Sequence, residues 1–452
     1  MTLGIRQRAT AIGLTLALVL PGICLAEPSL PGLFGEPRPS SQLIGCNRSA
    51  EHVILTRSAH LDPACSYTGG FEITQRNITL DCRGATIEDP EGNQAVGVLA
   101  HGGTNFAMAN VSVRNCIIQG FFNNFRVTRD GIRDLEPGQE TVNSYSHIEL
   151  RNSRILRSRG AGIVIDIFVS GITVRDVEVA ESGGVGIALE GGSRSNRIVH
   201  SHIHDNGFGD VDPVNGIPFE VAGIRYRLLS TGREGISLDG SHNNRISQNR
   251  FENNSNGAIT LYRNCGDMGP EGPNQSWLRR FGADNNRIRR NTFTNEVFGV
   301  WVGARMSQNQ LLRNCIDAAY VSGPGFRIHQ DFAKRNRILA NKFVNVTFAV
   351  RVEDDNTRVD RNKIESDNPS HRGIMIGTRN RGPALGQPVR GTIMRGNRTN
   401  IYLNPSPYTW IFDMDDTLFS RNRSSGHEAE LHQAVPPAFN LHLFIKQFRV
   451  AP

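Results

Sequence analysis

Six residues with side chains suited to binding and converting a sugar occupy matching positions in short alternating segments. They are Asp239, Tyr262, Trp301, Arg327, His329 and Arg351. Aromatic rings stack on sugars, arginine binds a carboxylate through two parallel hydrogen bonds, and acidic, phenolic or imidazole groups exchange protons. This combination favours a site for an acidic glycan. The alternative is that they are ordinary polar residues on the solvent-facing side of a sheet.

The favoured chemistry is removal of the C5 proton from a uronate, which begins both β-elimination and epimerisation. Arg327 or Arg351 would neutralise the sugar carboxylate. Tyr262 or His329 would act as the acid or the base. We expect Trp301 and Arg351 to hold the chain. Two arginines that follow their segments are expected at the rim of the groove; they are Arg263 and Arg305.

Two other functions fit the same residues. Glycoside hydrolysis needs two carboxylates flanking the scissile bond, and Asp239 with Glu234 or Asp205 could supply them. A non-catalytic scaffold that binds polysaccharide would need the groove but no convergent acid and base. Assays for reducing ends or unsaturated products would separate the enzyme from the scaffold.

Metal and disulfide chemistry can be considered from the same sequence. His204 and Asp205, together with Asp210 and Asp212, form a candidate Ca²⁺ site, although acidic loop residues are usually only solvated. We assign no metal ligand. The sequence has no Cys-x-x-Cys pair of the kind that binds zinc, and the six cysteines after residue 26 favour disulfides. The most plausible bridge is Cys46–Cys65, and the other pairings stay open.

The elements that must position these residues are repeats. The phrase Asn-Arg-Ile-x-x-Asn-x-Phe-x-Asn occurs at 244–253, 286–295 and 336–345, followed each time by a short apolar alternation. The alternating segments recur about every two dozen residues, and the two longer steps predict insertions at roughly 207–232 and 264–283. Strands of this period satisfy their hydrogen bonds by pairing with the next coil. The sequence therefore predicts an all-β parallel β-helix.

Within each predicted strand, successive side chains alternate between the core and the outside. Ile236 and Leu238 would face inward, and Ser237 and Asp239 outward. One outward column then includes Thr260, Trp301, Arg327, Arg351 and Met375. Asparagines at the corners would stack as an amide ladder; they are Asn249, Asn291, Asn341 and Asn362.

These repeats resemble the right-handed parallel β-helix superfamily, which includes pectate lyases, polygalacturonases and mannuronan epimerases. The resemblance covers roughly residues 71–399 and implies an exported, carbohydrate-active protein. The Asp-Pro-His, Gly-His-Gly and Trp-x-Asp-His motifs of those three enzyme groups are missing from this sequence. The resemblance therefore specifies the fold more closely than the reaction.

The ends of the chain complete the predicted organisation. Residues 1–26 have the basic start, apolar run and small final residue of a signal peptide. We expect an N-terminal extension and cap at 27–70, coils at 71–399 and a C-terminal capping tail at 400–452. The tail contains Asp413, Asp415 and Thr417, which resemble a phosphatase nucleophile motif, but too little chain follows for that domain.

Charge indicates the partner. The net charge is +7, with 50 Lys and Arg against 43 Asp and Glu, and only four of the cations are lysines. An arginine-built surface suits an acidic extracellular polymer, although a codon bias towards arginine would give the same composition. We expect an acidic polysaccharide partner, no nucleic acid, no membrane insertion, and a monomer in the periplasm or secreted.

Overall fold

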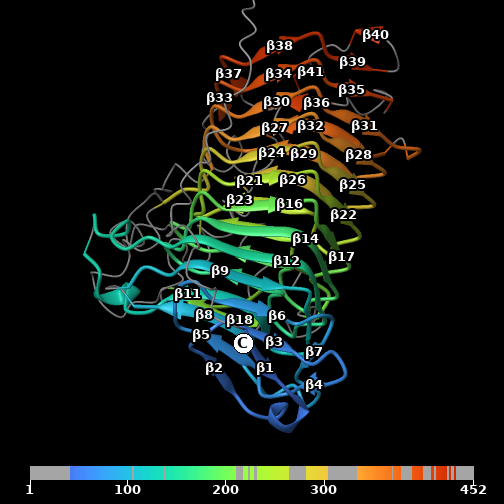
Figure 1. Ribbon diagram of the computed structural model, residues 1–452. Helices are drawn as coiled ribbons and strands as arrows, with labels where there is room; N and C mark the ends of the chain where they lie inside the picture. The colour runs from blue at the N-terminus through green and yellow to red at the C-terminus, as the bar shows by residue number, and fades with distance from the viewer. Residues whose placement is uncertain are drawn as a thin grey trace, which may run out of the picture. The chain divides into compact units, whose positions relative to one another are not determined.

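The computed structural model consists of stacked coils of short β-strands (Figure 1). It describes residues 41–103, 106–136, 138–209, 217–221, 224–228, 232–263, 281–303, 333–368, 370–377, 389–400, 409–411, 414–424, 427–428 and 432–433. All of them belong to one compact unit, Ser41–Pro452. The predicted signal peptide lies outside the described residues.

One side of each coil belongs to a 13-stranded parallel sheet. Its strands are β2 (Val53–Leu55), β5 (Phe71–Ile73), β8 (Val96–Gly102), β11 (Asn123–Arg129), β13 (Ile163–Ile165), β15 (Ile187–Leu189), β20 (Ile236–Asp239), β23 (Ile259–Tyr262), β26 (Phe298–Val302), β29 (Phe348–Val352), β32 (Arg372–Ile376), β36 (Thr409–Ile411) and β41 (His432–Gln433). The predicted all-β parallel β-helix is confirmed.

The remaining sides form a 24-stranded sheet made of two ladders. Ladder one contains β1 (Gln42–Ile44), β3 (Ala59–Leu61), β6 (Thr79–Asp81), β9 (Ala109–Arg114), β12 (Ser146–Leu156), β14 (Ile172–Ala180), β16 (Arg197–Val199), β21 (Arg245–Ser247), β24 (Arg287–Arg289), β27 (Arg337–Leu339), β30 (Arg358–Asp360), β34 (Ile393–Arg395) and β38 (Leu418–Ser420). Ladder two contains β4 (Ser66–Tyr67), β7 (Thr86–Glu88), β10 (Ile117–Gln119), β17 (His202–His204), β22 (Arg250–Glu252), β25 (Thr292–Thr294), β28 (Lys342–Val344), β31 (Lys363–Glu365), β35 (Arg398–Thr399) and β39 (Arg423–Ser424). The long strands β12 and β14 take part in both ladders.

Few described elements lie outside the coils. The strands β18 (Ile217–Val221) and β19 (Ile224–Leu228) form an antiparallel hairpin within the first insertion, and β33 (Val389–Arg390) pairs with β37 (Met414–Asp415). The strand β40 (His427–Glu428) runs antiparallel to β39. Two 3-10 turns complete the set, η1 (Cys46–Arg48) and η2 (Ile132–Asp134). Among all the residues that the structure describes, no helix has the length and apolarity needed to cross a membrane.

The coils extend beyond residues 71–399 at both ends. Strand β2 already pairs with β5, and β36 continues the 13-stranded sheet after β32. Trp410 of the phosphatase-like motif therefore lies in a sheet strand, while Asp413 lies outside the described residues. Three strands of the 13-stranded sheet, β23, β26 and β32, are followed by long runs of residues that lie outside the described structure, 264–280, 304–332 and 378–388. In chain order, each run precedes a strand of ladder one or β33.

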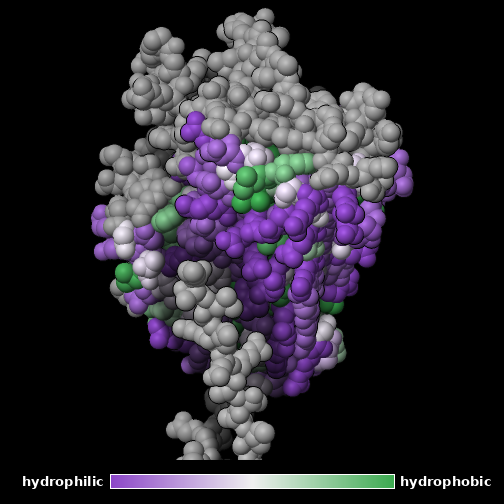
Figure 2. All heavy atoms as spheres, turned by 90° about the horizontal axis from the view of Figure 1, so that it is seen from above, coloured by the Kyte–Doolittle hydropathy of each residue, from purple (hydrophilic) through white to green (hydrophobic). Residues whose placement is uncertain are grey.

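The interior is a continuous apolar core contributed by every coil. Phe251, Phe293 and Phe343 stack on successive turns, with ring centroids 4.9 Å and 4.7 Å apart. Their backbones are paired in register, so the same side chain recurs at the same place in each layer. Outside, hydrophilic side chains cover most of the described surface in the view along the stack (Figure 2).

Buried asparagines join the coils at their corners. The backbone N–H of Asn249 donates to the side-chain oxygen of Asn291 at 2.9 Å, and the ladder continues through Asn341 to Asn362 at the same distance. Each amide nitrogen also donates to a backbone carbonyl, for example Asn291 to Ile246 at 3.1 Å. The predicted amide ladder is confirmed, and it satisfies polar groups that a buried corner would otherwise leave without partners.

A carboxyl group replaces an amide in a second corner ladder. Glu296 accepts hydrogen bonds from the backbone N–H of Asn254 at 3.2 Å and from its side-chain nitrogen at 2.7 Å. Burial raises the pKa of Glu296 well above its usual value, although the hydrogen bonds from Asn254 oppose this shift. The folded protein therefore holds a proton on Glu296 that the unfolded chain releases near its ordinary pKa.

We expect Glu296→Gln to stabilise the protein at neutral pH. A glutamine oxygen can accept both bonds, as Asn254 does for Asn206. The raised folded pKa means that wild-type stability falls as pH rises above about 4.5. The variant should lose that dependence and unfold at a higher temperature at pH 8, by roughly 1 °C for each kcal/mol gained in a unit of this size. Thermal unfolding at pH 5 and pH 8 measures this, with exposed Glu91→Gln as control. Identical pH profiles for Glu296→Gln and wild type would refute it.

Two disulfides close the first coils. Cys46 is bonded to Cys65, which confirms that predicted pair, and Cys82 is bonded to Cys116. The second bridge connects residues on neighbouring coils, so the sequence alone left it open. Cys265 and Cys315 lie outside the described residues. Disulfides are typical of proteins in oxidising compartments and indicate an extracytoplasmic location.

Candidate functional site

The outer face of the 13-stranded sheet carries the candidate residues, and we define it as the side chains of that sheet that point away from the core. In β20, Asp239 pairs directly with Tyr262 of β23. One column over, Ser237 pairs with Thr260, and Thr260 pairs with Trp301 of β26. Between these positions, alternate residues such as Ile236 and Leu238 are completely buried in the main core. The strand period therefore brings the polar residues together on one side.

Trp301 lies between an aromatic cluster and an arginine. The Arg351 guanidinium stacks over the Trp301 ring at 4.8 Å from its centroid, and the Phe298 ring lies 4.6 Å away on tilted planes. Arg351 also donates a hydrogen bond from Nε to the Glu353 carboxylate at 2.9 Å. The two side chains of this ion pair are only 5% and 0% exposed. A buried cation thus contacts the carboxylate of Glu353 and the aromatic ring of Trp301.

The outer face is covered at these coils, which corrects the expected exposed groove. Trp301 is 8% exposed, and Asp239 and Tyr262 are 3% and 1% exposed. Strand alternation shows which side of the sheet a residue occupies, but not whether other parts of the chain cover that side. Within the described structure, the Trp301 Nε1 and Thr260 Oγ1 atoms are buried without hydrogen-bond partners. Unpaired buried donors of this kind are costly unless another group binds them.

The order of coils also differs from the prediction. Trp301 pairs directly with Arg351, because β26 pairs directly with β29. The prediction of a strand at 325–329 between these two strands of the sheet is therefore wrong. That strand would have brought Arg327 and His329 into the outward columns. Both residues lie outside the described residues, as does Arg305. Arg263 follows Tyr262 at the end of β23 and is partly exposed.

The other predicted acidic residues are placed differently from one another. Glu234 precedes β20, is completely buried and pairs with Arg233, 3.2 Å from its Nε. His204 lies on ladder two, away from the outer face, and its Nδ1 contacts Asp205 at 2.7 Å. Asp210 and Asp212 of the candidate Ca²⁺ site lie outside the described residues. The described residues therefore do not assemble that site.

A network of histidines and carboxylates occupies the first coils of the same outer face, and sequence reasoning missed it. His101 contacts Glu72 through Nε2 at 2.8 Å and Asp130 through Nδ1 at 2.6 Å. Burial lowers the pKa of His101, but hydrogen bonds to Glu72 and Asp130 outweigh it and raise the pKa overall. Hydrogen bonds from His101 and His52 lower the pKa of Glu72. Extending the alternating register to coils before residue 163 would have found these residues.

An ion pair on the outer face follows the histidine–carboxylate network, in the direction of the middle coils. Arg126 contacts Asp166, with an Nε–Oδ2 distance of 2.7 Å, and both side chains are partly exposed. Asp166 and Glu190 come directly after β13 and β15, and Asp239 is the last residue of β20; these three strands pair in register up to the preceding residue. Carboxylates therefore recur on three successive coils, each step about 4.8 Å.

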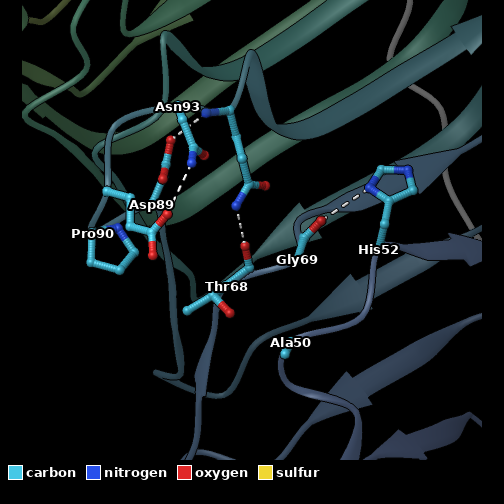
Figure 3. Close-up of a pocket in the computed structure, with 9 residues that line it drawn as sticks. Ala50, His52, Thr68, Gly69, Asp89, Pro90 and Asn93 are labelled. Atoms are coloured by element: carbon cyan, nitrogen blue, oxygen red, sulfur yellow. Dashed lines mark hydrogen bonds between the residues drawn. The ribbon is translucent and has the colours of Figure 1, made fainter.

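A hollow of about 470 Å³ lies beside the first coils (Figure 3). His52 contributes one wall and contacts the Gly69 carbonyl at 3.0 Å, and Gln94 donates to the Thr68 carbonyl at 2.6 Å. The Asp89 carboxylate accepts bonds from the backbone of Gly92 and Gln94. The polar groups that line the hollow thus bond largely to one another. We assign this hollow no chemistry.

The stacked parallel strands define a parallel β-helix protein, and two family models each match part of the chain. Residues 69–269 match the family model of the right-handed beta helix region. Residues 220–382 match that of the periplasmic copper-binding protein NosD. Within the described residues, the only three side chains whose ligand atoms lie close enough together to share one metal ion are Cys46, Asp62 and Cys65, and both cysteines are in the disulfide. The described residues therefore do not fit a copper site.

Solved structures show low similarity. The chain is 12% identical to an alginate lyase from Paenibacillus sp. str. FPU-7, with a TM-score of 0.40, covering 85% of this chain and 98% of that one. It is 11% identical to the periplasmic alginate epimerase AlgG, with a TM-score of 0.44, covering 85% of this chain and 84% of that one. It is 10% identical to a GH87 alpha-1,3-glucanase from Streptomyces thermodiastaticus strain HF3-3, with a TM-score of 0.42, covering 87% of this chain and 62% of that one. Similarities of this size carry no argument about the reaction. A comparison with curated protein sequences gave no significant match.

Proposed function

We propose that this protein acts outside the cytoplasm on an acidic polysaccharide, in a reaction that begins with removal of the C5 proton from a uronate. The supporting observation is that Asp239 and Tyr262 occupy directly paired positions on the outer face. Two proton-transferring groups on neighbouring strands are close enough to act on the same sugar, and the reaction requires that the sugar reach these largely buried side chains.

The roles follow from the chemistry of the step. Asp239 accepts the C5 proton, and the negative charge that develops spreads into the uronate carboxylate. Arg263, next to Tyr262 and partly exposed, neutralises that carboxylate. Tyr262 donates a proton to the departing glycosidic oxygen in an elimination, or to C5 from the opposite face in an epimerisation. Arg351, paired with Glu353, positions Trp301 instead of binding the sugar.

Glycoside hydrolysis is the second candidate, and the carboxylate row favours it specifically. Asp166, Glu190 and Asp239 recur one coil apart. Carboxyl groups one coil apart, at about 4.8 Å, approach the spacing of retaining glycosidases, about 5–5.5 Å, and those two coils apart, at about 9.6 Å, lie close to the upper limit for inverting ones, about 9.5 Å.

Product analysis tests the proposal. The full chain is incubated with polyuronates and with neutral glucans, and ultraviolet absorbance, reducing ends and C5 configuration are measured. We expect unsaturated ends or inverted C5 centres from polyuronates only. Saturated reducing ends would favour hydrolysis at the carboxylate row. Binding without any product would identify a non-catalytic scaffold and overturn the proposed reaction.

A further inference from the structure

A straight row of arginines runs along ladder one. Its members, the arginine row, are Arg197, Arg245, Arg287, Arg337 and Arg358. Each pairs directly with the next across neighbouring coils, so their backbones are about 4.8 Å apart and the row is roughly 19 Å long. Most of these side chains come from the second position of the repeated Asn-Arg-Ile phrase. The repeat that builds the fold therefore also builds a line of positive charge.

Most of the arginine row has no counter-charge among the described residues. Arg197, Arg287 and Arg337 are exposed and form no ion pair or side-chain hydrogen bond within the described structure. The neighbouring outward positions on the same four strands, β16, β21, β24 and β27, carry no carboxylate; they are Val199, Ser247, Arg289 and Leu339. Only at its end does the row meet an acid, where Arg358 pairs with Asp360.

Ladder two shows how a neutralised column looks in the same molecule. Lys342 and Lys363, on adjacent strands, both contact the Glu365 carboxylate, at 3.7 Å and 2.5 Å. Among the residues that the structure describes, the arginine row has no such partner between β16 and β27. Repulsion is felt locally, since burial and then the charges of Arg245 and Arg287 lower the pKa of Arg289. Stacked like charges of this kind destabilise a sheet unless an anion offsets them.

We propose that the arginine row is a binding track for an extended polyuronate chain, separate from the outer face where the reaction takes place. The choice of a polyuronate rests on the proposed function. A polyuronate carries a carboxylate on every sugar, and guanidinium groups bind carboxylates with two parallel hydrogen bonds. A straight row of evenly spaced guanidiniums matches a straight chain of evenly repeated carboxylates. The track holds the polymer while a different side of the same coils performs the chemistry.

The track is tested by binding, independently of turnover. Arg287→Gln/Arg337→Gln removes two adjacent charges, and Arg57→Gln/Arg83→Gln removes two exposed arginines from the first coils as a matched control. Isothermal titration with polygalacturonate, alginate, dextran and single-stranded DNA is performed at several salt concentrations, after circular dichroism has shown that each variant folds. We expect the row variant to raise the Kd for polyuronates at least about tenfold and to weaken the salt dependence. The control should match wild type.

Each other outcome overturns the track. If the row variant and wild type bind polyuronates with equal affinity, these arginines have no role in binding. If both double variants lose affinity equally, the effect is one of net charge and not of the arginine row. Tighter binding of DNA than of polyuronates would reassign the row to nucleic acid. Failure of the proposed reaction is distinguishable, because a protein without turnover can still show polyuronate binding that depends on Arg287 and Arg337.

Discussion

Asp239→Asn is expected to abolish turnover of the polyuronate while leaving polymer binding close to wild type. Asp239 accepts a proton only during the reaction, so its loss raises the barrier without removing a contact that holds the chain. Losing a general acid or base typically costs about 10²–10⁴-fold in rate. Initial rates of product formation and the Kd from titration, measured on the same preparation, separate the two effects.

Tyr262→Phe should give a loss of the same order, since the ring stays and only the phenolic proton is lost. Met375→Leu is the control, because Met375 occupies the same outer face as a buried apolar residue and substitution by leucine keeps its volume. Wild-type rates for Asp239→Asn would remove this pair from the mechanism. Loss of rate in Glu190→Gln but not in Tyr262→Phe would instead favour the hydrolytic carboxylate row.

Glu353→Ala is expected to lower the free energy of unfolding by about 3–5 kcal/mol, because it leaves the buried Arg351 guanidinium without its carboxylate. Both members of the pair are nearly inaccessible to water. The matched control is Glu365→Ala, which removes a partly exposed partner of two lysines and should cost about 0–1 kcal/mol. Urea denaturation followed by circular dichroism gives both values.

A double variant keeps this test decisive if Glu353→Ala fails to fold. Arg351→Met/Glu353→Leu replaces both charges by apolar groups of similar size, which is often neutral or stabilising for a buried pair. We expect the double variant to fold with stability close to wild type. A loss as large in the double variant as in Glu353→Ala would show that packing around Trp301, and not an unpaired charge, accounts for the effect.

Much of the fold could be predicted because its determinants are local. The alternation at Ile236–Asp239 and the corner asparagine at Asn249 recur with the coil period, and each coil repeats the same core contacts. Residue steps between apolar positions, such as Ile163 to Ile187, equal the registers in the sheet. The bridge between Cys46 and Cys65 followed from their proximity in sequence within the first coil.

The candidate site was harder, because pairing and coverage are properties of the whole molecule. The segment containing Phe326 and Ile328 has the alternation and spacing of a coil, yet β26 pairs with β29 directly. An alternating pattern within an insertion is the same, in sequence, as one within a coil. Burial of Trp301 likewise depends on what lies over the sheet, and no period in the sequence encodes that. His101 was missed because its partners Glu72 and Asp130 are distant in sequence.

The long runs of chain between paired coils have an evolutionary consequence. Residues 264–280, 304–332 and 378–388 all follow strands of the 13-stranded sheet, and the coils on either side still pair in register. Chain length at these three places can therefore change without disturbing the amide ladders or the apolar core. The coils act as a constant framework between which segments of different length can be inserted. Relatives could thus diverge in specificity by exchanging these connections alone, much as antibodies vary their loops on an unchanged scaffold.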